Sequence, residues 1–352
     1  MLIDMDYFFV ACEEIKRPEL VGKPTIVGAE PKEGRGRGVV MTCNYAARKF
    51  GIHSGMPISQ AYKLRPDANF LPVDYSYYEK KSEEAMAVIR GYSPALEQVS
   101  IDEAFIDVSE KAGDYDTAVI FAERIKHAIR EKAKLPCSIG VSTNKLMAKI
   151  ASDFAKPNGV KLVRGEDARD FIKDFKTDAL YGVGSKTKEK LDAMGYDTVG
   201  KLARANISEL VDKFGAFGID LHNYANGIDE SQVVENNVVK SIGREKTFER
   251  DTSEAKLITD SITELAKDVG ADAKRRGVSF KTVTLKMRYS DFSEQLRSRT
   301  VRPTDSAEEI ASNAILLYDT YHEKGRKVRK LGVKVSGLID YKSQKRLGDY
   351  FS

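Results

Sequence analysis

Cysteine and histidine are scarce in this chain of 352 residues, which contains three of the first and four of the second. Cys12, Cys43 and Cys137 lie far apart, and neither they nor the histidines show the close spacing of metal ligands. Disulfide frameworks and zinc sites need such residues in closely spaced groups. The sequence therefore argues against a zinc protein and agrees with a reducing compartment.

Long apolar runs are also missing. No run approaches the roughly 20 residues that a helix needs to cross a membrane, and Asp4 and Asp6 would interrupt the apolar core of a signal peptide. A hydrophobic content of 41% and a charged content of 31% are typical of a globular protein. We therefore expect a cytoplasmic protein, and at about 150 residues per domain the length indicates more than one domain.

The net charge of +4 is small, but its distribution is uneven. Between Lys240 and Lys342 there are 22 lysines and arginines against 16 acidic residues, so the rest of the chain is slightly acidic. A basic segment joined to an acidic body is typical of a metal-dependent enzyme that clamps nucleic acid. On these counts alone, a solvated charged surface explains the pattern equally well.

Acidic side chains stand inside two apolar runs, Leu2–Val10 and Val99–Ile106. An ionised carboxylate among apolar neighbours is costly unless it is paired or binds a metal ion. Asp102 and Glu103 would point to opposite faces of a regular strand, so both reach one site only at a hairpin turn or bulge. If Asp4 converges on them from a neighbouring strand, the three form an oxygen-only site suited to Mg²⁺. The alternative is that each acid is a satisfied carboxylate of an edge strand.

The first part of the chain mixes strand and helix patterns, which predicts an α+β body. Short apolar runs predict strands over Ile3–Val10, Thr25–Gly28, Val39–Cys43, Ile101–Val108 and Cys137–Val141. Apolar residues at every third or fourth position predict helices over Tyr77–Ile89, Tyr115–Ala133 and Asn144–Ala155. From about residue 164 short helical patterns separated by glycine replace the strands, and a polar linker is expected over residues 231–241.

A second mixed region follows the linker. Val278–Tyr289 alternates apolar and polar side chains, the segment around Val333 repeats this alternation, and Leu257–Ala273 and Ala307–Tyr321 have helical spacing. The polar faces of the two strands carry Lys286, Arg288, Lys330 and Lys334. A sheet with one apolar and one basic face can lie against a phosphate backbone.

Three residues could bind a polyphosphate. Tyr45 and Arg48 are three positions apart, so on a helix they share a face, and an arginine fork with a hydroxyl suits phosphate oxygens. Lys156 precedes Pro157-Asn158-Gly159, a turn that would hold its charge in place. Each of them is also explained as an ordinary surface residue.

A Gly-x-Gly turn at Gly182 and Gly184 separates two predicted helical segments, and Lys186 follows it. This arrangement is similar to a helix-hairpin-helix, whose turn presents backbone N–H groups to DNA phosphates without reading sequence. A glycine turn between helices is weak evidence when it stands alone.

The chain ends in a short segment with two adjacent aromatic residues. The spacing resembles the peptide that docks on sliding clamps of the proliferating-cell-nuclear-antigen type. One helical turn would project Leu347, Tyr350 and Phe351 into an apolar pocket, with Gln344 as the polar anchor. The alternative is a frayed tail with two aromatic residues.

Five segments together resemble the signature motifs of Y-family translesion DNA polymerases, in the branch of bacterial DNA polymerase IV and its archaeal relatives. In chain order they are Asp4–Phe9, Asn44–Gly51, Ser100–Phe105, Gly140–Lys145 and Ala155–Gly159. The resemblance extends over essentially the whole chain. It implies a template-directed DNA polymerase of low fidelity that copies past damaged bases in DNA repair and has no proofreading activity.

The resemblance implies a right-hand architecture of the α+β class. Its parts would be a palm with an antiparallel sheet and helices (residues 1–7 and 74–163), small fingers (8–73), an all-α helix-hairpin-helix thumb (164–230), a linker (231–241), an α+β little finger (242–342) and a clamp-binding tail (343–352). Only three residues precede Asp4, which leaves open whether the natural start lies upstream of Met1.

The resemblance also implies roles for single residues. Two Mg²⁺ ions would be held by the catalytic residues Asp4, Asp102 and Glu103 and by the Met5 carbonyl. The nucleotide would be contacted by Phe8, Phe9, Thr42, Tyr45, Arg48 and Lys156, with Phe9 as the steric gate against a ribose 2′-hydroxyl. DNA would be contacted by Gly182, Gly184, Lys186, Lys286, Arg288, Arg297, Arg299, Lys330 and Lys334. Asp6 is left out of the ligand set, because the family pattern does not make it a regular ligand.

The expected partners are primer–template DNA, deoxynucleotides and a sliding clamp, which would bind Gln344, Leu347, Tyr350 and Phe351. We expect a monomer with no membrane partner. The clamp-peptide spacing favours an archaeal source. The competing hypotheses are a metal-dependent nuclease or a nucleotide cyclase on a similar palm, and a non-catalytic DNA-binding repair factor.

Overall fold

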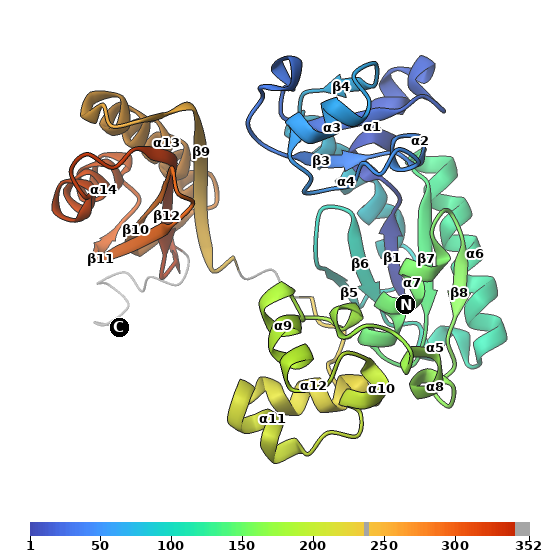
Figure 1. Cartoon of the computed structure of the whole chain (residues 1–352). Coiled ribbons are helices and arrows are strands. Elements are labelled where there is room, and N and C mark those ends of the chain that lie inside the picture. The colour runs from blue at the N-terminus through green and yellow to red at the C-terminus, as the bar shows by residue number, and fades with distance from the viewer. Residues whose placement is uncertain (236–238, 342–352) are drawn as a thin grey trace, which may run out of the picture. The chain divides into compact units, whose positions relative to one another are not determined.

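The computed structural model describes residues 1–235 and 239–341 (Figure 1). Contacts divide the chain into two compact units. Of the described residues, the first unit contains 1–35 and 39–235, and the second contains 36–38 and 239–341. Each unit combines helices with a sheet, which confirms the predicted α+β class. No helix in the described ranges is long and apolar enough to cross a membrane.

The main sheet of the first unit has the strand order β5-β6-β1-β7-β8. Its strands are β1 (Leu2–Met5), β5 (Leu96–Gln98), β6 (Glu103–Ile106), β7 (Cys137–Val141) and β8 (Val160–Leu162). β1 is antiparallel to both of its neighbours and is buried along its whole length. The first acidic residue of the chain, Asp4, therefore lies on the central strand.

Helices cover both faces of this sheet. On one face α4 (Tyr75–Arg90) and α6 (Tyr115–Lys132) share a core with Ile3, Met5 and Ile139. The short helix α5 (Ser109–Ala112) precedes α6. The apolar spacing of both long helices matches the predicted helical patterns, since their buried residues recur every three or four positions.

The helix α7 (Lys145–Ala155) covers the opposite face, where Leu2 and Phe105 pack against Ala148. Gly140 of β7 permits this close approach. A Cβ atom at Gly140 would lie 1.9 Å from the carbonyl oxygen of Ala148 and 2.4 Å from the backbone nitrogen of Ser152. Because side chains alternate along a strand, Asp4 shares this face with Leu2.

A smaller sheet with the order β3-β2-β4 packs against short helices. Its elements are β2 (Thr25–Gly28), β3 (Val40–Cys43), β4 (Asn69–Leu71), α1 (Phe8–Lys16), α2 (Tyr45–Arg48), α3 (Ile58–Leu64) and the 3₁₀ turns η1 (Pro18–Leu20) and η2 (Lys32–Gly34). It has a core of its own around Ile26, Val40 and Ile58.

The strand predicted over Ile3–Val10 is wrong in its second half. The strand ends at Met5, Tyr7 adopts a left-handed conformation (φ 37°, ψ 46°), and α1 begins at Phe8. A short apolar run does not distinguish a buried strand from a buried helix, which explains the error. Phe9 therefore comes from a helix.

Residues 164–230, all of which the structure describes, form helices and no strand beyond an isolated bridge. The elements are α8 (Ala168–Ile172), η3 (Thr177–Ala179), α9 (Ser185–Ala193), α10 (Val199–Leu202), α11 (Ile207–Phe214) and α12 (Phe217–Ala225). Their core includes Leu191, Leu202 and Leu221 together with Leu146 and Ile150 of α7. The same helix thus packs against the sheet on one side and the helical module on the other.

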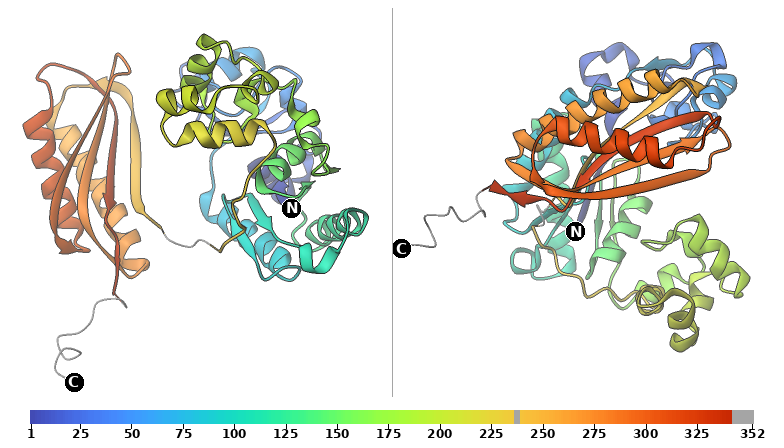
Figure 2. Two further views of the ribbon diagram at one scale, coloured as in Figure 1. Left: turned by 90° about the horizontal axis from the view of Figure 1, so that it is seen from below. Right: turned by 90° about the vertical axis from the view of Figure 1, so that its left-hand side faces the viewer.

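The second unit is a sheet with the order β11-β10-β12-β9. Its elements are β9 (Ser241–Thr252), α13 (Ala255–Arg275), β10 (Val278–Tyr289), β11 (Glu294–Thr304), α14 (Ala307–Tyr321), β12 (Val328–Ser336) and β13 (Ile339–Asp340), which pairs with β10. Both helices cover one face, where Val283, Leu285 and Met287 are buried (Figure 2). We call the other face of this sheet its open face.

Candidate active site

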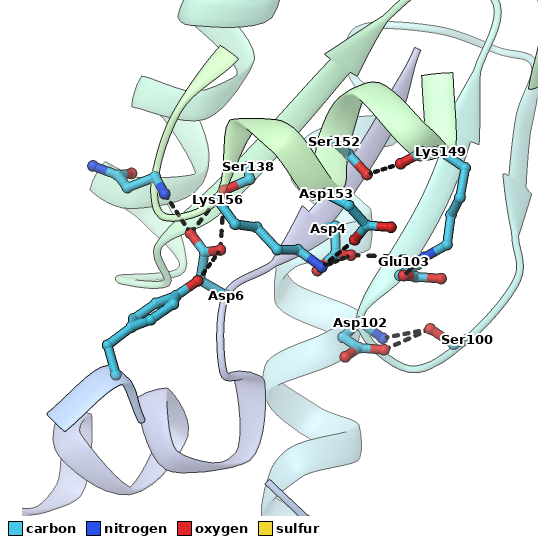
Figure 3. A network of polar contacts seen from close by, with 12 residues as sticks. Asp4, Asp6, Ser100, Asp102, Glu103, Ser138, Lys149, Ser152, Asp153 and Lys156 are labelled. Carbon is cyan, nitrogen blue, oxygen red and sulfur yellow. Dashed lines mark hydrogen bonds and ion pairs between the residues drawn. The ribbon is translucent and has the colours of Figure 1, made fainter. Parts of the chain in front are cut away.

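Asp4 of β1 and Glu103 of β6 are direct partners across the antiparallel strands. Such partners have their side chains on the same face, here the face under α7. Asp4 is 4% exposed and Glu103 is half-buried, and each carboxyl group shifts the pKa of the other. The convergence predicted from the sequence is present for these two acids (Figure 3).

Asp102 lies in the hairpin between β5 and β6, immediately before Glu103. The backbone N–H groups of Val99 and Ser100 donate to the carbonyl of Glu103 at 3.1 and 3.4 Å, which closes the turn. The carboxylate of Asp102 accepts a hydrogen bond from the Ser100 hydroxyl at 2.5 Å, away from the Asp4–Glu103 pair. Burial raises the pKa of Asp102, although the Ser100 hydroxyl opposes this.

Two lysines of the α7 region contact the acid pair. Nζ of Lys156 lies 2.6 Å from Oδ2 of Asp4 and 2.9 Å from Oδ1 of Asp153. Lys149 forms an ion pair with Glu103, and its Nζ lies 3.9 Å from Oδ2 of Asp4. Lys156 was predicted from the sequence as a site residue, and Lys149 was not. Lys149 could have been found from its seven-residue distance to Lys156. Seven residues are about two helical turns, which places both lysines on one face.

The two acids resist being ionised together. Burial and the hydrogen bond with Glu103 raise the pKa of Asp4 to about 8, although Lys156 acts in the opposite direction. Burial also acts to raise the pKa of Glu103, but hydrogen bonds with Asp4 and Lys149 outweigh it, so this pKa is lowered. Two buried carboxylates need positive charge nearby, and the lysines supply it here.

The same need would be met by a hard cation, since Asp4, Glu103 and Asp102 offer only oxygen donors. Within the part of the chain that the structure describes, however, no group of three or more Asp, Glu, His or Cys side chains is gathered closely enough to hold a metal ion. Asp102, turned toward Ser100, is the predicted ligand that stands apart. The donor chemistry of the three residues fits Mg²⁺.

Asp6 has a different environment, although it is only two residues from Asp4. It is 1% exposed and accepts hydrogen bonds from the Ser138 hydroxyl at 2.9 and 3.1 Å, the Asn158 N–H at 2.8 Å and the Tyr45 hydroxyl at 3.3 Å. These donors satisfy the carboxylate without a metal ion. The hydrogen bonds of Asp6 thus connect the end of β1 with β7, with the turn after Lys156 and with α2.

Tyr45 and Arg48 share a face of α2, as their spacing predicted. The guanidinium of Arg48 lies 5.1 Å from the centre of the Tyr45 ring, and its Nε donates to the Cys43 carbonyl at 3.2 Å. Thr42 lies half-exposed at the adjoining strand β3. Through Asp6, Tyr45 is connected to the turn that follows Lys156.

Phe8 and Phe9 begin α1 and differ in exposure. Phe8 is 2% exposed, so its ring is part of the hydrophobic core. A ligand could therefore contact little of Phe8 other than its backbone. Phe9 is half-buried and stacks on Tyr78, with ring centres 4.6 Å apart and planes inclined by 15°. Tyr75 meets the Phe9 ring edge-on at 6.3 Å. The Phe9 ring therefore has a fixed orientation.

The Gly-x-Gly turn lies where the sequence placed it, before α9. Gly182 has φ 81°, a conformation that favours glycine, and a Cβ there would come within 3.1 Å of the Phe217 ring. Gly184 is the N-cap of α9, and Lys186 is exposed in its first turn. The turn thus leaves backbone N–H groups and a positive charge at the surface.

The basic residues predicted on the second unit do not form one surface. Lys286, Arg288, Lys330 and Lys334 lie on the open face. Arg297 and Arg299 pair with the buried Leu285 and Val283, which places them on the helix-covered face at the edge strand β11. The Arg297 guanidinium accordingly lies 5.0 Å from the Tyr321 ring of α14.

The open face also carries acidic residues that were not predicted as part of it. Glu245 forms ion pairs with Lys286 at 3.2 Å and with Lys330, and Glu294 pairs with Lys286 at 3.2 Å and with Arg288. The face is therefore less positive than its lysines and arginines alone indicate. Gln344, Leu347, Tyr350 and Phe351, the predicted clamp-binding residues, lie outside the described residues.

Family models match three segments of the chain. Residues 3–153 match the impB/mucB/samB family, residues 239–347 match the C-terminal domain of that family, and residues 178–229 match the thumb domain of DNA polymerase-iota. DNA polymerase IV of Methanoculleus marisnigri is 43% identical over 96% of this chain and 93% of that protein. The chain belongs to the Y family of DNA polymerases, in the DNA polymerase IV branch.

Other relatives agree with this assignment. DNA polymerase IV of Streptococcus pneumoniae serotype 2 is 39% identical over 96% of each chain. Among solved structures, a Dbh-Dpo4(243-245)-Dbh chimera of Y-family polymerases has a TM-score of 0.86 at 30% identity, over 96% of this chain and 98% of that one. An insertion ternary complex of Dbh DNA polymerase has a TM-score of 0.66 at 30% identity and the same coverage.

The resemblance recognised from the sequence is thus confirmed, and the chain is a DNA-directed DNA polymerase of a metal-dependent family. This overturns the competing hypotheses of a nuclease, a cyclase and a non-catalytic binding factor. The archaeal source stays a prediction, because a streptococcal relative has similar identity.

Proposed function

We propose that this DNA polymerase IV copies past damaged template bases with low fidelity, by nucleotidyl transfer that depends on two Mg²⁺ ions, and without proofreading. The observation that carries the proposal is the Asp4–Glu103 pair on adjacent strands, with Asp102 in the adjoining turn and Lys156 2.6 Å from Asp4. A metal-dependent transferase needs such buried acids beside a cation that can bind phosphate.

Asp4, Asp102, Glu103 and the Met5 carbonyl would hold the ions. Bound Mg²⁺ supplies the positive charge that lowers the pKa of a primer 3′-hydroxyl and offsets the charge of a triphosphate. Lys156, Arg48 and the Tyr45 hydroxyl would bind the phosphate oxygens. Asp6 supports this arrangement, because it accepts hydrogen bonds from both Tyr45 and the turn that follows Lys156.

The Phe9 ring would act as the steric gate that excludes ribonucleotides. Its stacking on Tyr78 and its edge contact with Tyr75 support this role, since a gate has to keep its position when a larger sugar presses on it. Thr42 and the backbone of Phe8 would complete the nucleotide contacts.

Primer–template DNA would contact the Gly182–Gly184 turn and Lys186 through its phosphates. The open face, with Lys286, Arg288, Lys330 and Lys334, would provide a second contact with the backbone. The proposed lack of proofreading follows from the resemblance to the Y family, whose models match residues 3–153, 178–229 and 239–347.

Primer extension by the purified full chain tests the proposal. Wild type with Mg²⁺ and deoxynucleotides should extend primers on both undamaged and abasic templates, whereas Glu103→Gln should lose activity by at least about a hundredfold, the scale of losing transition-state charge stabilisation. Asp116→Asn removes a carboxylate that is 88% exposed and should retain full activity. The proposal fails if wild type stops at the abasic site or if Glu103→Gln remains fully active.

The recruitment by a sliding clamp, with a monomeric enzyme docking through Gln344, Leu347, Tyr350 and Phe351, has a separate test. Removal of residues 343–352 should abolish stimulation by a clamp of the proliferating-cell-nuclear-antigen type and leave extension without a clamp unchanged. Equal stimulation of the shortened and full chains would exclude this docking peptide.

A further inference from the structure

Lys149 has no role in the mechanism proposed above, yet its ammonium group contacts both acids of the Asp4–Glu103 pair. Its side chain is 28% exposed, forms an ion pair with Glu103 and lies 3.9 Å from Asp4. It projects from the middle of α7, which the close contact at Gly140 holds against the sheet. The base of the side chain is therefore fixed, while its ammonium group faces both acids.

Lys149 differs from Lys156 in what surrounds it. Lys156 is paired with Asp4 and Asp153 and precedes a turn that is hydrogen-bonded to Asp6. Lys149 instead borders a cavity of about 350 Å³, which is also lined by Glu103, Lys145, Tyr181 and Tyr224. A lysine has a flexible four-carbon stem, so its ammonium group could leave Glu103 and withdraw into this solvent-accessible space.

A divalent cation and an ammonium group cannot occupy the same place at one carboxylate, and their charges repel each other at a few ångströms. We propose that Lys149 is the internal counter-ion of Glu103. It neutralises this carboxylate in the metal-free protein, withdraws when a divalent cation binds, and thereby weakens metal binding by its charge. This inference rests on the proposed function, in which Glu103 is a metal ligand.

Direct metal binding tests the inference on the full chain without DNA or nucleotide. Mn²⁺ is titrated into wild type, Lys149→Gln, Lys149→Arg and Lys145→Gln, and the free Mn²⁺ is measured by electron paramagnetic resonance. Lys149→Gln should bind Mn²⁺ roughly tenfold more tightly than wild type, the scale of one partly exposed ion pair. Lys149→Arg keeps the charge and should bind like wild type. Lys145→Gln removes a charge one turn earlier on α7, where it is paired with Glu97, and should also bind like wild type.

Thermal unfolding provides a second measurement. In the presence of a chelator, Lys149→Gln should melt at a lower temperature than wild type, because Glu103 has lost its counter-ion, and Mn²⁺ should raise its melting temperature more than that of wild type. A variant that is merely misfolded would lose stability in both conditions.

Glu103→Gln distinguishes a failure of the counter-ion role of Lys149 from a failure of the proposed function. If it binds Mn²⁺ as wild type does, Glu103 is not a metal ligand, and the proposed function needs another site. If Glu103→Gln weakens binding while Lys149→Gln binds no more tightly than wild type, only the counter-ion role fails. Equal binding by wild type and Lys149→Gln, including no binding by either, overturns the inference.

Discussion

At the level of single residues, burial determines chemical reactivity, and the three cysteines illustrate this. Burial raises the pKa of Cys12 and Cys137 to about 12, and it also raises the pKa of Cys43. Only the thiolate is a nucleophile, and at pH 8 a thiol with a pKa of about 12, as in Cys12 and Cys137, is ionised to roughly one part in ten thousand. We predict that iodoacetamide at pH 8 labels the native protein far more slowly than the urea-denatured protein, in which all three thiols react.

Mass spectrometry of the intact chain measures this labelling directly. Labelling of the native protein is expected to be slower because a raised thiol pKa lowers the fraction of reactive thiolate at every pH below that pKa. Fast modification of Cys12 or Cys137 in the native state would contradict the burial of these residues.

The sugar selectivity is also a property of one residue. Phe9→Ala removes the ring that stacks on Tyr78, so a ribose 2′-hydroxyl should gain room, and incorporation of ribonucleotides should rise by about a hundredfold relative to deoxynucleotides, within the range of steric discrimination. The ratio of kcat/KM for the two nucleotides checks this. Phe154→Ala, which removes an exposed aromatic ring of the stacked cluster with Phe175, is the matched control. An unchanged ratio in Phe9→Ala would show that another residue selects the sugar.

The sequence predicted individual site residues only where the type of side chain limited the possibilities. Carboxylates in apolar runs have few explanations, so Asp4 and Glu103 could be singled out before their contact was known. Lys149 could not, because a lysine on a helix is ordinary, and its role depends on packing between α7 and the sheet. For Asp6 the strand period suggested equivalence with Asp4, and only its four hydrogen bonds show the difference.

At the level of secondary structure, agreement with the sequence depends on how long the periodic pattern is. The twelve-residue alternation of β10 and the spacing of α14 predicted both elements with the bounds that the structure has, Val278–Tyr289 and Ala307–Tyr321. Around Phe8 the pattern was too short, and one predicted strand is in fact a strand followed by a helix. The basic residues of β10 and β12 were correctly predicted to share one face of the sheet. Arg297 and Arg299 of β11 lie on the opposite face, because the register between β10 and β11 decides which face their side chains occupy.

Gly140 determines how closely α7 approaches the sheet. Gly140→Ala would place a Cβ atom 1.9 Å from the Ala148 carbonyl oxygen, and backbone atoms cannot give way as a flexible side chain can. The helix must therefore shift, together with Lys149 and Lys156. We predict a loss of about 3 kcal/mol in the free energy of unfolding and a fall in polymerase activity even at temperatures where the variant is folded.

Urea titration with circular dichroism measures the stability change. Gly184→Ala is the matched stability control, because no atom beyond its two chain neighbours lies within 4 Å of a Cβ at that position, and its cost should stay below about 1 kcal/mol. Equal stability of Gly140→Ala and wild type would mean that α7 is not held by this contact.

At the level of the whole molecule, the linker between the two units begins inside the first unit. Leu146 N–H donates to Asp229 at 3.0 Å, and the ammonium group of Lys145 donates to the Gln232 carbonyl at 3.2 Å. Glu97 accepts from Lys145 at 2.9 Å and from the Val234 N–H at 3.2 Å. The polar segment 231–241 predicted as a linker therefore has Gln232 and Val234 attached to α7 and β5.

Glu97 is the residue on which this attachment depends, since it binds both Lys145 and the Val234 N–H. Glu97→Gln keeps the shape but loses the charge, so the segment should open locally, and amide hydrogen exchange over residues 232–235 should accelerate about five- to tenfold, the effect of losing roughly 1 kcal/mol. A longer free tether lowers the effective concentration of the second unit at DNA bound by the first, so affinity for primer–template DNA should fall a few fold. Asp170→Asn, which breaks an exposed pair with Lys173, should change neither quantity. If exchange accelerates while DNA affinity stays constant, tether length does not limit binding, and if exchange is unchanged, Glu97 does not hold the segment.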